Sequence, residues 1–514
     1  MFVHRSSHPT GAVTLVVAVL VVGLGACSSS KNASPATTRP AVASTGAPAQ
    51  TTTTVARPSG PAATLTPLSG GSGPYMGEST PPDLVKLGYT THEFAAAGTA
   101  TSYKVDGALT HDGRWKLVPD ASAAYRTRVL VRQPADPSKF SGNVLVEWLN
   151  VSGGIDADPE WVSLQDEIVR AGDAWVGVSA QRIGVEGGPV LVSVKGVPGG
   201  YQAGEGLKKI DPARYGTLDH PGDAYSYDIF TQVARAVRTG AGLSGLHPEH
   251  LIAGGESQSA FALVSYYDGV QPLTHAFDGF FVHSRGAVGL PFDTAPGGAA
   301  GIQNALNGTA ALFRTDQDAP VMDIQTETDV ASILDSYAAR QPDNPHLRLW
   351  EVAGTAHADA HLLGSTAKYI DCGAPINDGD MYIVAQAAWH ALTMWIDTGT
   401  PPRHAPRIDV TADPTPTVQR DGDGIALGGI RTPPVDVPVA AVSGVPGPNP
   451  STICLLLGSA KPLSASRLAQ LYPSRAAYLQ KFTADADATI KAGFALPEDR
   501  ASLVAFAEPQ RIAG

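Results

Sequence analysis

The sequence has few charged residues, few cysteines and few long apolar runs, and each shortage excludes a class of function. Charged residues make up 16% of the 514 residues, below the roughly one quarter typical of soluble proteins. The net charge is -12 and no cluster of Lys or Arg stands out. Because proteins that bind nucleic acid carry basic patches, we expect no nucleic-acid partner.

The one long apolar stretch, residues 13–24, has the length of a signal-peptide core and is short for the roughly 20 residues of a membrane helix. It ends in Leu24-Gly25-Ala26-Cys27, which resembles the bacterial lipobox. We predict a lipoprotein signal peptide over residues 1–26. Acylation of Cys27 would anchor the exported protein at the outer face of the cell membrane. The alternative is an ordinary signal peptide in which Cys27 has no role.

The chain has only three cysteines, so few pairings are open to it. If Cys27 carries a lipid, Cys372 and Cys454 remain, and an exported compartment permits a disulfide. We predict that these two are bonded. Two buried free thiols are the alternative.

Composition divides the chain near residue 73. Residues 27–73 are rich in Ser, Thr, Pro, Ala and Gly, and we interpret them as a disordered tether. Residues 74–514 have the composition of a globular domain. Aliphatic and aromatic residues, 43% of the whole chain, are enough for a large core.

Short apolar runs alternate with helical patterns in the first two thirds of this domain. The alternation predicts an α/β fold with a mostly parallel central sheet and helices on both faces. The expected strands are residues 125–131, 143–149, 174–178, 251–253, 277–282, 320–325 and 347–353. The expected helices are residues 160–170, 224–238, 259–267 and 380–396.

Three segments depart from this alternation. Residues 182–220 and 286–318 are rich in Gly and Pro and follow expected strands. Loops at the carboxyl ends of strands build the sites of such sheets, so these two are candidate caps over a pocket. Surface insertions are the alternative. Residues 401–514 form a C-terminal extension with a β-like part, 407–443, followed by helices at 464–471 and 474–492.

The string Gly255-Glu256-Ser257-Gln258-Ser259 lies between an expected strand and an expected helix. A serine nucleophile in a tight strand-to-helix turn needs small residues two positions before and after it. Gly255 and Ser259 meet this need, although the usual second glycine is a serine. We predict that Ser257 is the nucleophile. The alternative is that Ser257 only caps the helix.

A histidine that can act as base follows the last strand of the predicted sheet. The strand at 347–353 ends at Gly354, and the next loop carries His357. His361 follows at metal-ligand spacing, but the sequence lacks the Glu of the H-E-x-x-H motif. We therefore predict a catalytic base at His357, with no metal and no cofactor.

Two carboxylates follow the strand at 320–325, between the serine and the histidine in chain order. The order Ser, acid, His is that of α/β-hydrolases. We prefer Asp329 as the acid that orients His357, and Glu327 is the alternative.

Backbone N–H groups that hold the oxyanion are expected at two places. One is Gln258, directly after the nucleophile. The other is the loop after the strand at 144–148, where Asn150 or Val151 is the candidate donor.

The chain from about Tyr75 to its end resembles a family of bacterial α/β-hydrolase-domain proteins that are mostly exported. The resemblance implies the α/β-hydrolase fold and the triad positions given above, and says little about substrate. The strings that carry it are VEWLNVS, GGESQSA, TETDV, AGTAHAD and GGIRTPPVDVP.

We expect a serine hydrolase that cleaves small carboxylic esters through an acyl-enzyme. An acyltransferase or an amidase would use the same triad. The rival prediction is a non-catalytic envelope lipoprotein that binds a ligand or partner on this scaffold.

Overall fold

The structure is a computed structural model and describes most of the chain after the predicted tether. The described residues are 59–77, 83–194, 203–295, 297–300, 306, 308–412, 415–449 and 451–513. The predicted signal peptide, Cys27 and residues 28–58 lie outside the described residues. Within the described ranges, no helix combines the length and the apolar character needed to cross a membrane.

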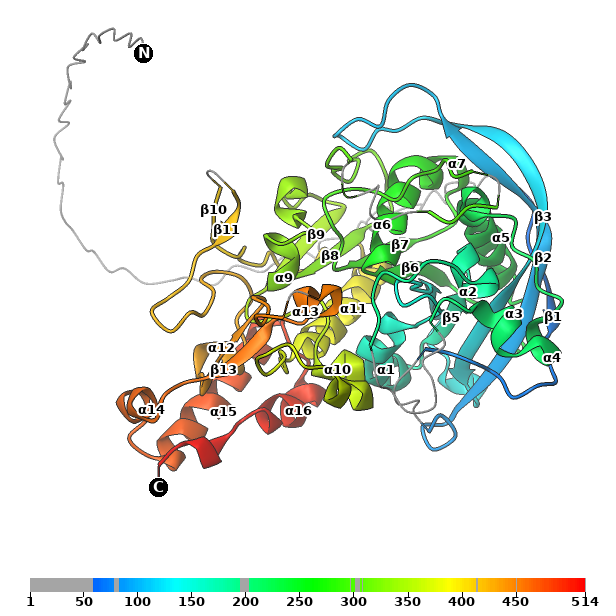
Figure 1. The fold of residues 1–514 in the computed structure, drawn as a ribbon. Helices are drawn as coiled ribbons and strands as arrows, with labels where there is room; N and C mark the ends of the chain where they lie inside the picture. The colour runs from blue at the N-terminus through cyan, green and yellow to red at the C-terminus, as the bar shows by residue number, and fades with distance from the viewer. Residues whose placement is uncertain are drawn as a thin grey trace, which may run out of the picture. The chain divides into compact units, whose positions relative to one another are not determined.

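A nine-stranded sheet forms the centre of the described part (Figure 1). Its spatial order is β1-β2-β3-β5-β4-β6-β7-β8-β9. The strands from β5 through β4 to β9 are parallel, while β1, β2, β3 and β5 pair in antiparallel fashion. The strands are β1 (Thr64–Pro67), β2 (Tyr89–Val105), β3 (Leu117–Pro134), β4 (Asn143–Trp148), β5 (Ala174–Val178), β6 (His250–Glu256), β7 (Gly279–His283), β8 (Val321–Thr326) and β9 (Leu347–Val352).

Helices cover both faces of the sheet. One face packs against α1 (Pro159–Ala171) and α11 (Met381–Thr398), and the other against α5 (Ser226–Arg238) and α6 (Gln258–Ser265). Side chains along β4 alternate between the two cores, because successive residues of a strand point to opposite faces. Trp148 belongs to the α5 side and Leu145 to the α1 side. The predicted fold class, a mostly parallel sheet with helices on both faces, is confirmed.

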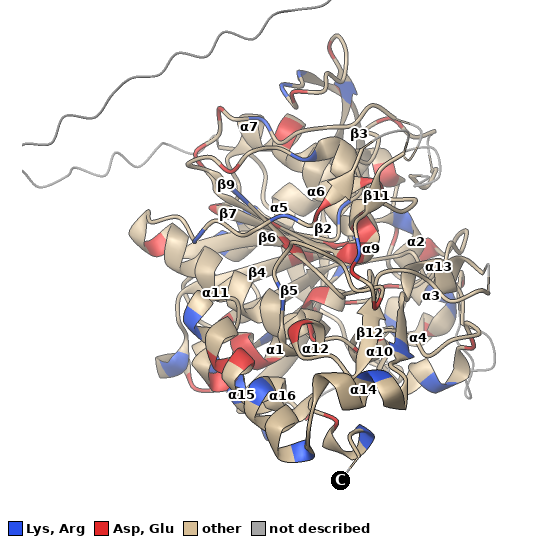
Figure 2. Ribbon diagram, turned by 90° about the vertical axis from the view of Figure 1, so that its left-hand side faces the viewer, with Lys and Arg blue, Asp and Glu red and all other residues tan. Residues whose placement is uncertain are grey.

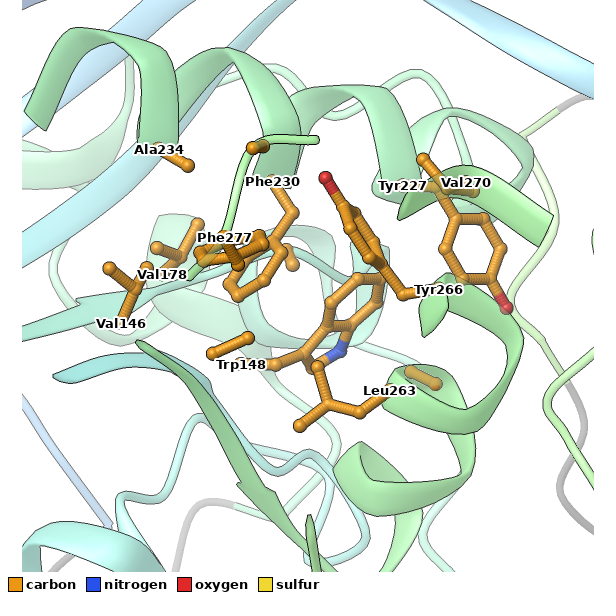
Figure 3. Close-up of a cluster of buried hydrophobic side chains, with 14 of the residues drawn as sticks. Val146, Trp148, Val178, Tyr227, Phe230, Ala234, Leu263, Tyr266, Val270 and Phe277 are labelled. Carbon is orange, nitrogen blue, oxygen red and sulfur yellow. The ribbon is translucent and has the colours of Figure 1, made fainter. Parts of the chain in front are cut away.

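The core on the α5 side is an aromatic cluster around Trp148 (Figure 3). The ring of Trp148 lies 5.5 Å from that of Tyr227 and 5.1 Å from that of Phe230. Its indole N–H donates to Gln181 Oε1 at 3.1 Å. The cluster packs α5 and α6 onto the sheet and so fixes the helix that follows β6.

The folded part begins before the predicted boundary at residue 73. Strand β1 lies inside the segment assigned to the tether and pairs with β2. Ala63 is buried, and its N–H donates to Gln232 O at 2.9 Å. Strand pairing uses backbone groups, so a segment of Thr, Pro and Ala can join a sheet edge without an apolar pattern.

The C-terminal extension packs on the β9 end of the sheet. Ile430 donates to Glu351 O at 2.7 Å and accepts from Ala353 N at 2.9 Å, so the Gly-Gly-Ile-Arg string extends the sheet beside β9. The segment at 407–443 is less regular than expected, with only short strand pairs. Its elements and those that follow are β10 (Val410–Thr411), β11 (Thr417–Val418), α12 (Pro433–Asp436), β12 (Ala440–Ser443), α13 (Thr452–Leu456), β13 (Ser459–Pro462), α14 (Ala465–Leu471), α15 (Arg475–Ala492) and α16 (Arg500–Ala505).

Candidate active site

Ser257 lies in the tight turn between β6 and α6. Its backbone angles are φ 59 and ψ -123, a conformation that non-glycine residues rarely adopt. A Cβ on Gly255 would lie 2.8 Å from Ser259 Cβ, so the turn requires glycine there. Ser257 N–H donates to His283 O at 3.0 Å, which fixes the turn to the end of β7. The turn predicted around Ser257 is therefore present.

His357 lies between Ser257 and Asp329. Its Nε2 is 2.8 Å from Ser257 Oγ and its Nδ1 is 2.7 Å from Asp329 Oδ1. Asp329 Oδ2 accepts from both the N–H and the hydroxyl of Thr326, each at 2.7 Å. Burial raises the pKa of Asp329, but the charge of His357 and these hydrogen bonds outweigh it and lower the pKa below its ordinary value. The structure thus brings together the three side chains predicted as a triad.

Glu327, the alternative acid, has other partners. Its carboxylate accepts from Gly354 N–H at 2.8 Å, at the start of the loop that carries His357. The remaining partners belong to the C-terminal extension: Arg420 Nη2 at 2.6 Å, Ser443 Oγ at 2.9 Å and Gly444 N at 2.9 Å. Glu327 therefore ties the His357 loop to the extension and does not contact His357.

The loop after β4 lies beside the turn, as predicted, and distinguishes the two candidate donors. The N–H of Asn150 donates to Ala157 O at 2.9 Å and is not free to hold an oxyanion. The Asn150 side chain instead donates to Glu256 O at 3.0 Å. Among the described residues, the N–H groups of Val151 and Gln258 have no hydrogen-bond acceptor. Val151 and Gln258 stay the predicted N–H donors to the oxyanion. The prediction that the N–H of Asn150 could be such a donor is wrong.

A small polar chamber beside His357 was missed by the sequence reasoning. In Figure 2, acidic segments coloured red lie near the centre of the view, between the labels β6 and α9 (Glu327–Val330). Glu256 and His283 end adjacent strands in register, and Glu160 approaches them from α1. His283 Nδ1 lies 3.5 Å from Glu160 Oε2 and 3.7 Å from Glu256 Oε2. The chamber is lined by Ser163, Glu256, His283, Ala356, His357, Ala358, Asp359, His361, Leu362, Met381 and Tyr382.

Burial shifts the pKa values of Glu256, Asp359 and His283 toward their neutral forms. It raises the pKa of Glu256 to about 8 and that of Asp359 to about 6, and it lowers the pKa of His283. His283, at the end of the strand that pairs with β6, was the one signal in the sequence for this chamber.

His361 has a structural position. Its ring stacks on Tyr382, with centroids 3.8 Å apart, and its Nε2 lies 3.2 Å from Val162 O. In the part of the chain that the structure describes, no group of three or more His, Cys, Asp or Glu residues is arranged to hold a metal ion.

A disulfide joins Cys372 and Cys454 near the His357 loop, the pairing expected from the cysteine count. Cys454 lies in α13, and Leu456 O at its end accepts from Ala358 N at 3.0 Å. The disulfide therefore fixes a short helix that contacts the loop directly after His357.

The two cap candidates contact different parts of the site. In residues 182–220, Leu191 N donates to Ser152 O at 3.0 Å and Gly204 N to Gly154 O at 2.9 Å, so this segment adjoins the loop after β4. In residues 286–318, Leu290 N donates to Phe261 O at 3.0 Å, on α6. Residues 195–202, 296, 301–305 and 307 of these segments lie outside the described residues. A lid function stays a prediction.

Comparison with protein families assigns the fold. The family model described as alpha/beta hydrolase domain matches residues 59–505. A comparison with curated proteins finds no match.

Similar solved structures are hydrolases of distant sequence. An α/β serine hydrolase without lid from Xanthomonas campestris is 15% identical, with 60% of this chain and 97% of that chain covered and a TM-score of 0.28. An esterase from Rhizomucor miehei is 12% identical, with 58% and 85% covered and a TM-score of 0.29. A carboxylesterase from Lactobacillus plantarum is 9% identical, with 46% and 75% covered and a TM-score of 0.25.

The ion pair of Glu327 predicts a large loss of stability on Glu327→Gln. The change removes the charge of the buried partner of Arg420, whose own side chain is partly exposed, and a hydrogen bond to a charged group contributes about 1.5–3 kcal/mol. Urea unfolding followed by fluorescence should show this loss in the free energy of unfolding. Asp487→Asn breaks an exposed pair with Arg500 and serves as the control, with little expected change. A loss in Glu327→Gln no larger than in the control would contradict the role given to Glu327.

The raised pKa of Glu256 predicts a pH-dependent contribution to stability. Between about 4.3, the value of an unfolded Glu, and about 8, the folded value, the folded state binds the extra proton. The contribution of Glu256 to the free energy of unfolding therefore falls as the pH rises through that window, by up to about 1.4 kcal/mol per pH unit. Unfolding of wild type and Glu256→Gln should be compared between pH 5 and pH 8. The difference in free energy of unfolding between wild type and Glu256→Gln should shrink as the pH rises. A difference that stays constant across this pH range would contradict the raised pKa of Glu256.

Proposed function

Because the chain belongs to the alpha/beta hydrolase domain family, we propose that it is a serine hydrolase that cleaves carboxylic esters through an acyl-enzyme on Ser257. The observation that carries the proposal is the continuous chain from Asp329 Oδ1 through His357 to Ser257 Oγ, with contacts of 2.7 and 2.8 Å. The three residues follow three parallel strands of one sheet. Such an arrangement supplies a nucleophile, its base and the group that orients the base.

Acylation proceeds by attack of Ser257 Oγ on the ester carbonyl carbon as His357 Nε2 takes the serine proton. Asp329 holds the His357 tautomer that accepts this proton and stabilises the imidazolium. The free N–H groups of Gln258 and Val151 are the proposed donors to the oxyanion, and Gln258 lies at the N-terminus of α6, where the helix dipole favours negative charge. The protonated His357 then gives its proton to the leaving alcohol.

The acyl-enzyme is released when water, deprotonated by His357, attacks the acyl carbon. Transfer to an alcohol and cleavage of an amide would use the same groups. The rival function, a lipoprotein that only binds a ligand, has no need of a histidine hydrogen-bonded to both a strained serine and a buried aspartate. This contact pattern favours the enzyme.

Hydrolysis of short- and long-chain p-nitrophenyl esters tests the proposal. Ser257→Ala and His357→Ala should each lower kcat/KM by about 10⁴-fold or more, and Asp329→Asn by somewhat less. Asp335→Asn, a change at a partly exposed aspartate outside the triad, is the matched control and should keep most of the activity. Wild-type turnover that survives Ser257→Ala would refute the proposal.

We also propose that the protein is exported and held by lipid on Cys27 at the outer face of the cell membrane. The lipobox-like Leu24-Gly25-Ala26-Cys27 string supports this. After expression in a bacterial host, the wild type should partition with membranes and lack residues 1–26 by mass spectrometry, and Cys27→Ala should lose the lipid mass. A full-length, unlipidated wild-type chain would contradict the proposal.

A further inference from the structure

The chamber beside His357 has the size and the polarity of a water site. Its free volume is about 10 Å³, close to the space needed for one water molecule. Of the three triad residues, only His357 lines it. The other lining groups include the carboxyls of Glu256 and Asp359 and the imidazole of His283.

Several polar atoms in this chamber, or next to it on Glu160, are buried without a partner. Among the described residues, neither Glu256 Oε2 nor His283 Nδ1 has a hydrogen-bond partner, and neither carboxylate oxygen of Glu160 has one. The 3.5 and 3.7 Å separations between His283 and the two carboxyl groups exceed ordinary hydrogen-bond distances. Because buried polar groups are almost always satisfied by protein or by water, the unpaired atoms indicate that a water completes this cluster.

We propose that this chamber binds the water that hydrolyses the acyl-enzyme, with Glu256 as the residue that positions it. The proposal rests on the proposed function, because it assigns a role within the second half of that reaction. Glu256 directly precedes Ser257 in the chain and reaches the same chamber as His357. A water held by Glu256 therefore lies next to the imidazole that must deprotonate it.

The step balances with water as the only added reactant. The water oxygen bonds to the acyl carbon while its proton passes to His357 Nε2. The tetrahedral intermediate then collapses, the bond from the acyl carbon to Ser257 Oγ breaks, and His357 returns the proton to Oγ. With its pKa raised to about 8 by burial, Glu256 is protonated at neutral pH and can donate a hydrogen bond to the water.

The size of the chamber also bears on the choice between hydrolysis and transfer. A space for about one water fits water better than the larger molecule of an alcohol. Met381 is buried and forms part of the wall, so Met381→Ala would enlarge the chamber. The wild type should therefore pass its acyl group to water in preference to methanol, and Met381→Ala should raise the share passed to methanol.

Single-turnover and burst kinetics with p-nitrophenyl acetate separate the two halves of the reaction. The nitrophenol burst reports acylation, and the later steady phase reports deacylation. In Glu256→Leu, which removes both side-chain oxygens, we expect the acylation rate constant to stay within about twofold, and deacylation to slow by about tenfold or more. Acyl-enzyme should then accumulate, seen as an acetyl mass on the intact protein.

Glu147→Leu is the matched control. Glu147 is a buried glutamate on β4, and its carboxylate accepts from Glu160 N, Trp161 N and Trp175 Nε1, but it does not line the chamber. Its loss should lower stability and leave the ratio of deacylation to acylation unchanged. A merely structural role for Glu256 would give the same result as this control.

Each outcome decides the proposal. Equal slowing of both steps in Glu256→Leu, or no slowing of deacylation, overturns the role of the chamber while leaving Ser257 as nucleophile. Absence of a burst and of an acetyl adduct in the wild type overturns the proposed function instead. If Glu256→Leu does not fold, the methanol share of Met381→Ala is measured, and an unchanged share overturns the proposal.

Discussion

The hydrogen bond between His357 Nε2 and Ser257 Oγ joins two residues 100 positions apart in the chain, and much of the fold serves to hold its two ends. Ser257 is fixed by a strained turn, which persists because β6 pairs on both sides and α6 packs into the aromatic core. His357 lies on a loop beyond β9, near the last strand of the sheet. A loop has no regular hydrogen bonding of its own, so its position depends on what packs against it.

That support comes from the C-terminal extension. Glu327 connects the start of the His357 loop with Arg420 and the β12 end, and the Cys372–Cys454 disulfide fixes α13 against the residue after His357. The extension therefore holds the loop that carries His357 in place through contacts on both sides of that residue. This also explains why two carboxylates, Glu327 and Asp329, stand so close together in the sequence. Glu327 connects the His357 loop to the C-terminal extension, and Asp329 is hydrogen-bonded to the imidazole of His357.

The positions of the parallel strands along the chain could be predicted because these strands are short apolar runs. Ser257 and His357 could be placed because each follows such a run. The choice between Asp329 and Glu327 could not be settled, because it depends on a single helical turn capped by Thr326, which points the two side chains in different directions. Strand β2 has an Ala- and Thr-rich sequence without an apolar pattern, and it is held by its long pairing with β3.

Contacts between residues far apart in the chain could not be predicted from the sequence either. The N–H of Asn150 is taken by Ala157 across a turn of the loop, and Glu160, Glu256 and His283 meet from one helix and two strands. No local sequence pattern predicts these contacts, because each residue taken alone is typical of an ordinary helix or strand. Glu256 and His283 line the chamber beside His357, and burial shifts the pKa values of both toward their neutral forms.

The most direct measurement is the site of covalent labelling by a fluorophosphonate, mapped by peptide mass spectrometry on the folded protein. The account predicts one adduct, on Ser257, which disappears in His357→Ala because the serine is then no longer activated. Labelling of another residue, or none at a probe concentration that labels a known serine esterase in parallel, would contradict the claim that Ser257 is the nucleophile.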